Sequence, residues 1–296
     1  MKWWLNGALV DPAGVSCAVN TYSLHYGFAV FEGIRTYDVD GVARAFKLDE
    51  HIARFYDSAR MLGLAIRGCE PEGLARAVLE TVASWDEKDL YVRPLLYLGN
   101  GVMGLRTAVP DHNLAVLVWP YGTDRGSARY REGISVQISR HRRSKEHALA
   151  KVSGNYLSAV VAANELEGTG FDEAVLLDED GFLSEATAQN IFIVKGGRLA
   201  TPRTTACLDG ITRRTVIALA SGAGMAVEER DILPAELLSA DEAFLTSTAS
   251  EVLPIARVQA STLASPRKDS VTRQLMALYQ QRVVSSNPSV EFEHVA

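Results

Sequence analysis

The chain has 296 residues, and its 47% hydrophobic and 22% charged fractions exclude an intrinsically disordered protein. This length allows two domains, because a single hydrophobic core stops growing near about 250–300 residues. The net charge of −6 argues against nucleic acid as the main partner, and the three cysteines and six histidines form no CxxC or HExxH motif, so we expect no metal site and no disulfide framework.

The N-terminal segment lacks the pattern of an export signal. Its apolar residues are interrupted by Asn6, Gly7 and Asp11, whereas a secretory signal needs roughly 7–15 consecutive apolar residues. No stretch approaches the ~20 apolar residues of a spanning helix. We therefore expect a cytoplasmic protein with no membrane partner.

Strands and helices alternate irregularly over the first half of the chain. Asn6-Gly7 and Asp40-Gly41 are typical of tight hairpin turns, because these residues accept positive φ angles. Helices are predicted where apolar residues recur at helical spacing. In chain order, we predict a hairpin at Trp4–Leu9, strands at Phe28–Tyr37 and Val42–Phe46, helices at Leu48–Leu62 and Pro71–Trp85, and strands at Leu90–Leu98 and Leu114–Trp119.

The second half follows a polar, glycine-bearing stretch from Pro120 to Gly133, which predicts a linker. Asp180-Gly181 and Gly196-Gly197 are predicted hairpin turns, and Ser285–Ala296 is predicted to be a frayed tail. We predict strands at Ile134–Ser139, Glu173–Leu177, Asn190–Val194, Ala226–Arg230 and Ala243–Thr246, and helices at Ser153–Leu166, Ile211–Ala223 and Arg267–Val283.

The tight turns between neighbouring strands indicate antiparallel pairing. The fold class is therefore predicted as α+β rather than a doubly wound parallel sheet. We expect a small N-terminal α+β domain over residues 1–120, an interdomain loop over 121–132 and a large C-terminal α+β domain over 133–296.

A glycine motif and a basic run each match a known binding pattern, but their surroundings argue against that function. Gly99–Gly104 matches the GxGxxG dinucleotide motif and follows a strand, but no helix can follow it before Pro110. We therefore interpret it as a loop between strands. The basic run Arg140–Lys145 is the one cluster that could contact phosphates; in an acidic chain it is more typical of a solvated loop, or of a patch that attracts an anionic small molecule.

Lys151 and Glu185 are candidates for chemistry. Lys151 lies between Ala150 and Val152, and a lysine with apolar neighbours can lose its hydration, lower its pKa and act as a nucleophile; the alternative is a solvated lysine. Glu185 lies in a stretch of small polar residues between two strands. It could hold a proton on a heteroaromatic nitrogen, or belong to a surface turn.

Two further segments could bind anions. Leu208–Arg214 precedes an apolar helix, whose first N–H groups can hold an anion, although Thr212 could instead cap that helix. Thr246–Glu251 carries small hydroxyl residues just after a strand and could be a phosphate or carboxylate site or a capping loop. Arg54 falls on the polar face of its helix, so periodicity alone makes it a solvated arginine.

Together these motifs resemble the fold-type IV, pyridoxal-phosphate-dependent aminotransferases, over nearly the whole chain. The second half carries a lysine with a tyrosine five residues later, an acidic residue about 35 residues on, a Gly-Ile-Thr-Arg helix start and a Ser-Thr-Ala loop. In the first half, Phe31–Arg35 (Phe-Glu-Gly-Ile-Arg) and Tyr91–Leu95 (Tyr-Val-Arg-Pro-Leu) are similar to the branched-chain amino acid aminotransferase subgroup.

The resemblance implies a role for each matching residue. Pyridoxal 5'-phosphate (PLP) would form a Schiff base with Lys151, which would also shuttle the proton. The other implied cofactor contacts are Glu185 to the pyridine nitrogen, Tyr156 to the ring hydroxyl, Leu208 on the ring face, and Arg54, Ile211, Thr212 and Thr248 around the phosphate. The implied substrate contacts are Tyr26, Phe31, Arg35, Tyr91, Arg93, Ala249 and Ser250.

The resemblance also implies a reaction: amino transfer from a branched-chain or related aliphatic L-amino acid to 2-oxoglutarate. Arg93 would bind the second carboxylate of 2-oxoglutarate. The partners would be small amino and keto acids and a second copy of the chain, with Tyr26 lining the neighbour's pocket. The alternative is a fold-type IV relative that acts on D-amino acids, amines or aminodeoxychorismate, as a transaminase or lyase.

Some residues depart from the family pattern around the implied substrate pocket. Ser247 replaces a glycine, the Ser184–Ala188 segment is less glycine-rich than usual, and Asp124 and Arg125 occupy a loop where branched-chain enzymes tend to carry an aromatic residue. His147 stands where proline is common. We hypothesise that Asp124 and Arg125 make the pocket more polar; the alternative is that both point into solvent.

Overall fold

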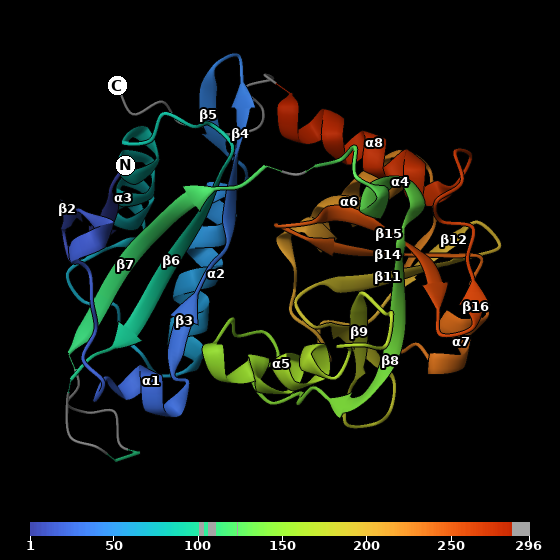
Figure 1. The fold of residues 1–296 in the computed structure, drawn as a ribbon, viewed down its shortest axis with the longest axis horizontal. Helices are drawn as coiled ribbons and strands as arrows, with labels where there is room; N and C mark the ends of the chain where they lie inside the picture. Colours follow the sequence, from blue (N-terminus) through green and yellow to red (C-terminus); the bar gives the residue numbers. More distant parts are fainter. Residues whose placement is uncertain (101–103, 106–110, 123, 286–296) are drawn as a thin grey trace. The chain divides into compact units, whose positions relative to one another are not determined.

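The computed structural model describes residues 1–100, 104–105, 111–122 and 124–285. This part of the chain divides into two compact units (Figure 1). Of the described residues, the first unit contains those of Met1–Gly122 together with Ala150–Gly154 and Val283–Ser285, and the second contains 124–149 and Asn155–Arg282. The middle of the glycine motif and the predicted tail from residue 286 lie outside the described residues.

The first unit is built on an antiparallel sheet. Its strands follow the order β2-β1-β7-β6-β4-β5, and β3 also pairs with β6. The predicted turns are confirmed, with positive φ at both Asn6-Gly7 and Asp40-Gly41. The strands are Trp3–Leu5 (β1), Ala8–Val10 (β2), Ala29–Phe31 (β3), Ile34–Val39 (β4), Val42–Ala45 (β5), Leu90–Leu98 (β6) and His112–Pro120 (β7).

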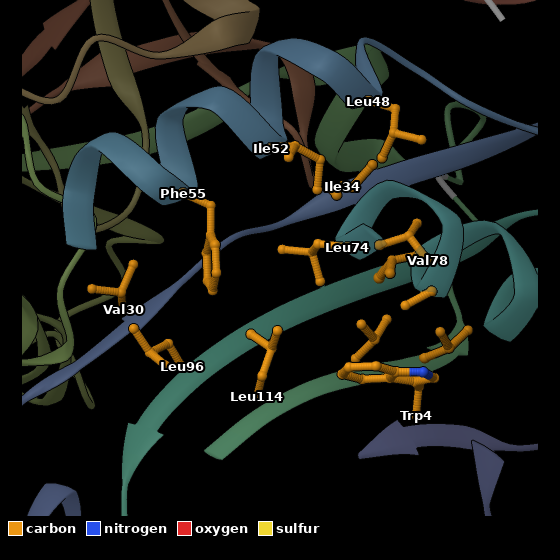
Figure 2. Close-up of a cluster of buried hydrophobic side chains, with 14 of the residues drawn as sticks. Trp4, Val30, Ile34, Leu48, Ile52, Phe55, Leu74, Val78, Leu96 and Leu114 are labelled. Atoms are coloured by element: carbon orange, nitrogen blue, oxygen red, sulfur yellow. The ribbon is translucent and has the colours of Figure 1, made fainter. Parts of the chain in front are cut away.

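Two helices supply much of the first core, shown in Figure 2. They are α2 (Leu48–Met61) and α3 (Pro71–Ala83), at the predicted positions, and a short helix, α1, covers Tyr22–Tyr26. In α2 the buried residues include Ile52, Phe55 and Ala59, spaced three and four residues apart, so one helix face meets the core. Each large apolar side chain stabilises the fold by roughly 1.5–3 kcal/mol on burial.

The predicted strand Phe28–Tyr37 is wrong in one respect, because the chain leaves the sheet at Glu32 and Gly33. Glu32 is fully buried. A Cβ atom at Gly33 would lie 1.9 Å from the hydroxyl of Tyr91, so the close approach of that tyrosine requires glycine. At this interruption between β3 and β4, the Glu32 carboxylate is buried in the protein interior.

The second unit contains a mixed sheet in the order β10-β9-β8-β15-β14-β11-β12-β13, with β16 beside β15. The expectation of antiparallel pairing is wrong for part of it, because β8 pairs parallel with β9 and β15, and β12 with β13. The strands are Ile134–Arg142 (β8), Glu173–Leu177 (β9), Leu183–Ala186 (β10), Asn190–Lys195 (β11), Arg198–Thr201 (β12), Val227–Glu229 (β13), Glu242–Ser247 (β14), Glu251–Val258 (β15) and Ser261–Thr262 (β16).

Helices pack against this sheet. Helix α5 (Leu157–Asn164) contacts β8 and β9, α6 (Ile211–Gly222) contacts β14, and α4 (Ala128–Glu132) contacts β15. The predicted linker therefore contains a short helix. The remaining helices are α7 (Pro234–Leu238) and α8 (Val271–Val284). The α+β class is confirmed in both units.

The sequence predicts a stretch between two strands, or a surface turn, around Glu185. This segment is instead strand β10, all four residues of which are buried. Strand β10 pairs antiparallel with β9, and the Asp180-Gly181 turn connects the two strands, with a φ of 91° at Gly181. The carboxylate therefore projects from a fixed strand rather than from a loop.

Candidate active site

Lys151 belongs to the first unit and is held by its backbone. Its carbonyl accepts a hydrogen bond from the N–H of Phe31 (3.1 Å), and its own N–H donates to the hydroxyl of Ser58 in α2 (3.0 Å). Val152 bridges to Val30 in an antiparallel sense. The Nζ atom lies 4.8 Å from the centroid of the Phe31 ring. The lysine is thus fixed at the edge of β3, with buried apolar neighbours on both sides.

Arg54 is not the solvated arginine that helical periodicity predicts. Its side chain is only 12% exposed and binds Glu32 through two hydrogen bonds, Nε to Oε1 at 2.6 Å and Nη2 to Oε2 at 2.9 Å. His51 Nδ1 lies 2.7 Å from the same Oε2. Periodicity failed here because the break at Glu32 directs a carboxylate toward the polar face of α2.

The charges of this cluster depend on one another. Burial alone would raise the pKa of Glu32, but Arg54 and His51 outweigh it and hold the pKa far below its usual range. Burial lowers the pKa of His51. Glu32 is therefore an anion that orients the Arg54 guanidinium. Sequence reasoning missed both Glu32 and His51, although Glu32 lies inside the quoted Phe31–Arg35 motif.

Arg93 lies among aromatic rings of the first unit. Its guanidinium carbon is 4.8 Å from the ring centroid of Phe31, 5.6 Å from that of Tyr91 and 5.7 Å from that of Trp119. Its Nε atom is buried and has no hydrogen-bond partner among the described residues. A buried donor without a partner is costly, so this arginine is ready to receive an anionic acceptor.

Arg35 extends the same cluster. It is 2% exposed and lies over the rings of Tyr37 and Tyr121, and Tyr121 contacts Tyr91 edge-on at 5.4 Å between centroids. Four of the predicted substrate residues, Phe31, Arg35, Tyr91 and Arg93, therefore share one aromatic neighbourhood. Tyr26 does not join it: this residue lies in α1, 38% exposed, against Tyr22.

Glu185 of the second unit is held by three donors. Arg143 Nε donates to Oε1 at 2.5 Å, and Asn190 Nδ2 and the N–H of Leu208 donate to Oε2, each at 3.1 Å. The side chains of Arg143 and Glu185 are 9% and 10% exposed. Leu208 is thereby tied to the carboxylate by its backbone. These three hydrogen bonds fix the orientation of the Glu185 carboxylate.

The basic run Arg140–Lys145 is not a uniform patch. Arg143 is buried on Glu185, a role that sequence reasoning missed because its neighbours in the run face outward. Arg140 pairs with Glu165 on the surface, and Lys145 pairs with Asp180 and Asp178. Within the run, Arg140, Arg143 and Lys145 are therefore each paired with an acidic side chain.

Helix α6 begins at Ile211 with Gly210 as its N-cap, without a side-chain hydrogen bond to the cap and without an acidic residue in the first turn. The alternative that Thr212 caps the helix is therefore wrong. A Cβ atom at Gly210 would lie 2.0 Å from Oδ1 of Asn190, so only glycine allows this approach. The first N–H groups of a helix have no acceptor within the helix, and they favour an anion.

The predicted carboxylate loop connects β14 to β15. The N–H of Ser250 donates to the Ser247 hydroxyl (3.0 Å), and the Tyr130 hydroxyl donates to the Ser250 carbonyl (3.0 Å). Thr248 and Ala249 are half-buried. Tyr156 is half-buried and ends a 3-10 turn, Ser153–Tyr156, just before α5. The second unit thus brings Glu185, Leu208 and the α6 start together, with the 248–250 loop at the end of strand β14.

The two charged linker residues differ: Asp124 is exposed, as the solvent alternative expects, whereas Arg125 is half-buried. Arg125 forms a two-bond ion pair with Glu251, and Asp124 accepts a hydrogen bond from the N–H of Gly126 (3.1 Å). His147 is exposed, and its carbonyl accepts a hydrogen bond from Asn155. Arg125 is thus occupied by a protein carboxylate.

The described residues fit PLP in kind. They offer a fixed lysine, an oriented carboxylate, a helix start with unfilled donors and a partly buried arginine. No group of three or more possible metal ligands occurs among the described residues. Within the same part of the chain, no helix combines the length and apolar character needed to cross a membrane.

Comparison with known proteins points the same way. The family model of amino-transferase class IV matches residues 29–258. The branched-chain-amino-acid aminotransferase of Pseudomonas aeruginosa is 36% identical over 93% of this chain and 91% of that protein. A putative branched-chain-amino-acid aminotransferase of Methanocaldococcus jannaschii is 37% identical over 93% and 94%.

Solved structures agree with these relatives. The branched-chain aminotransferase of Thermoproteus uzoniensis with norvaline superposes with a TM-score of 0.90, at 35% identity over 98% of this chain and 97% of that one. The PLP-form (holo-form) of the branched-chain amino acid aminotransferase of Thermobaculum terrenum gives a TM-score of 0.87, at 28% identity over 96% and 94%.

Proposed function

Because the chain belongs to the class IV aminotransferases, we propose that it is a PLP-dependent enzyme that moves an amino group from a branched-chain or related aliphatic L-amino acid to 2-oxoglutarate. The observation that carries this proposal is the buried Glu185, which three donors orient beside Leu208 and the start of α6. Its relatives and structural neighbours carry branched-chain aminotransferase names, several of them at 32–37% identity.

Each residue then has a task toward the cofactor. When bound, PLP supplies an electron sink that allows the α-proton of an amino acid to be removed. Lys151 holds the cofactor covalently through Nζ and moves that proton. Glu185 pairs with the pyridine nitrogen and keeps it protonated, Tyr156 donates to the ring hydroxyl, and Leu208 packs on the ring face. Arg54, the N–H groups of Ile211 and Thr212, and Thr248 bind the phosphate.

The proposed substrate residues bind three different parts of the substrates: the aliphatic side chain, the distal carboxylate and the α-carboxylate. Phe31 offers apolar surface to an aliphatic side chain, which gains roughly 1.5–3 kcal/mol on burial, and Tyr91 assists the loop that binds the α-carboxylate. Arg93 receives the distal carboxylate of 2-oxoglutarate through its unfilled Nε, and Arg35 supports the same wall. The loop of Ala249 and Ser250 binds the α-carboxylate that every donor and acceptor shares.

The cofactor assignment is tested by Lys151→Ala. We expect loss of the visible absorbance of the bound cofactor and of nearly all turnover. Borohydride reduction of the wild-type protein should place the cofactor label on the peptide that contains Lys151. Lys145→Ala is the control, because Lys145 binds Asp178 and Asp180 instead of the site. A label on any other lysine overturns the assignment.

The substrate assignment is tested with a panel of L- and D-amino acids and amines, each paired with 2-oxoglutarate. Aliphatic L-amino acids should give the highest kcat/KM. A preference for D-amino acids or amines, or release of product without an acceptor, would instead support the alternative transaminase or lyase.

The proposed enzyme is a dimer of two identical chains. We infer a homodimer in which Tyr26 faces the neighbour's pocket, and its 38% exposure in the single chain supports this. Sedimentation of the active enzyme measures the assembly directly. A fully active monomer would contradict it.

A further inference from the structure

Glu251 stands in an unusual backbone conformation at the start of β15. Its φ is +57°, in the left-handed region that residues with a Cβ rarely adopt, and its side chain is only 6% exposed. A strained residue of this kind persists only where its surroundings hold it. Glu251 also directly follows the loop Thr248–Ser250, so its conformation sets the direction in which that loop enters β15.

Arg125 holds Glu251 in this conformation through an ion pair. Its Nε donates to Oε2 of Glu251 at 2.9 Å and its Nη2 donates to Oε1 at 2.6 Å, so the guanidinium grips both carboxylate oxygens in a planar fork. The Arg125 side chain is 33% exposed, so the pair lies at the edge of the protein interior, with the carboxylate on the buried side.

A second contact fastens the same two segments. Tyr130, which is 8% exposed in α4, donates its hydroxyl hydrogen to the carbonyl of Ser250 at 3.0 Å. The stretch from Arg125 to Tyr130 therefore meets the 248–251 turn at two consecutive residues. Both contacts lie inside the second unit.

We propose that the Arg125–Glu251 ion pair is a latch that sets the affinity of the 248–250 loop for the α-carboxylate of the substrate. This inference rests on the proposed function, which assigns the α-carboxylate to that loop. Arg125 acts as a positioning residue: it fixes Glu251 and cancels a negative charge that would otherwise stand next to the bound carboxylate and repel it.

The latch predicts a defined kinetic pattern. Arg125→Ala should raise KM about tenfold for both the amino donor and 2-oxoglutarate, with kcat within about twofold, because both substrates carry the α-carboxylate. The Kd of 4-methylvalerate, a monocarboxylate without an amino group, should rise by a similar factor in calorimetry. Arg129→Ala is the control, since Arg129 is exposed in α4.

Rescue variants separate charge from geometry. The double variant Arg125→Ala/Glu251→Gln should recover at least about threefold of the lost affinity, because it removes the Glu251 carboxylate charge that Arg125 no longer balances. Arg125→Lys keeps the positive charge but cannot form the two parallel hydrogen bonds of the guanidinium. The affinity of this variant for 4-methylvalerate should therefore lie between those of wild type and Arg125→Ala. If Arg125→Ala does not fold, Arg125→Lys and the double variant, whose cofactor absorbance reports folding, carry the same comparison.

The results distinguish this proposal from the proposed function. A wild-type enzyme without transamination activity contradicts the function, whereas an active enzyme whose Arg125→Ala variant keeps KM and the 4-methylvalerate Kd within about twofold overturns the latch. A double variant as weak as Arg125→Ala also overturns the charge argument.

Discussion

Nε of Arg143 lies 2.5 Å from Oε1 of Glu185 in the second unit, where both side chains are about nine-tenths buried. The pair leaves the other oxygen of Glu185 to Asn190 and to the backbone of Leu208. An arginine behind the carboxylate keeps it aligned, as the pairing with a protonated pyridine nitrogen requires.

Arg143→Met should therefore weaken both the fold and the catalytic site. Removing one partner of a buried pair leaves an uncompensated charge, so the free energy of unfolding should fall by about 3–5 kcal/mol. We expect kcat to fall about tenfold, because a misaligned Glu185 no longer secures the ring nitrogen. Chemical denaturation and steady-state kinetics measure the two effects.

The matched control for Arg143 lies three residues earlier, on β8. Arg140 is 78% exposed and pairs with Glu165 at the surface, so Arg140→Met should change stability by less than about 1 kcal/mol. Equal effects at Arg140 and Arg143 would show that burial of the Glu185 pair has no special importance.

Glu32→Gln should change the pH dependence of stability. The folded-state pKa of Glu32 lies below its usual value of 4.5, because Arg54 and His51 outweigh the opposing effect of burial. Its ionised form therefore stabilises the protein above that value, and the contribution is lost as the pH falls below it. We expect wild type to exceed Glu32→Gln by about 3–5 kcal/mol at neutral pH, and the gap to narrow in acid.

Denaturation of both proteins from neutral pH to well below the usual pKa of 4.5 measures this gap. Asp57→Asn provides the control in the same helix, because Asp57 forms only a surface pair with Arg60. A gap that stays constant across this pH range would mean that the Glu32 charge does not stabilise the fold.

Arg93→Met should affect one substrate and spare the other. The methionine keeps the apolar contacts with Phe31 and Trp119 but cannot bind a distal carboxylate. We expect KM for 2-oxoglutarate to rise at least about tenfold, while KM for leucine stays within about twofold. Arg60→Met, on the exposed side of α2, is the control. A parallel rise for leucine would place Arg93 at the shared α-carboxylate instead.

The cysteines should differ sharply in reactivity. Burial raises the pKa of the Cys207 thiol to about 12, whereas Cys17 is exposed. A thiol reagent at mildly alkaline pH should label Cys17 quickly and Cys207 only after unfolding, because the thiolate is the reactive form. Mass spectrometry of labelled peptides, with Cys17→Ser as the control, follows each site. Fast labelling of Cys207 in the native protein would show that the segment before Leu208 opens.

Local patterns predict the local parts of this fold well. The alternating burial of β6 and the turn at Asp40-Gly41 follow from neighbouring residues, so they can be predicted from the sequence. The parallel pairing of β8 with β9 and β15 cannot, since it joins segments far apart in the chain. Long-range pairing leaves no periodic signal in a single sequence.

The same limit applies to the candidate site. The resemblance selects Glu185, and the structure shows how it is held. Arg143 could not be selected, because one buried arginine within a basic run has the same local pattern as its exposed neighbours. Helical periodicity places Arg54 in solvent, and its contact with the distant Glu32 shows that this assignment is wrong.

The position of Lys151 has a consequence for synthesis on the ribosome. Ala150–Gly154 completes the first unit although it follows the first 27 residues of the second unit's chain, Thr123–Leu149. Until this segment emerges, the backbone of β3 at Val30 and Phe31 lacks the partners that Lys151 and Val152 provide. An unpaired strand edge is a template for aggregation. A nascent chain that stalls after residue 122 therefore exposes the edge that the full-length chain later closes with its candidate catalytic lysine.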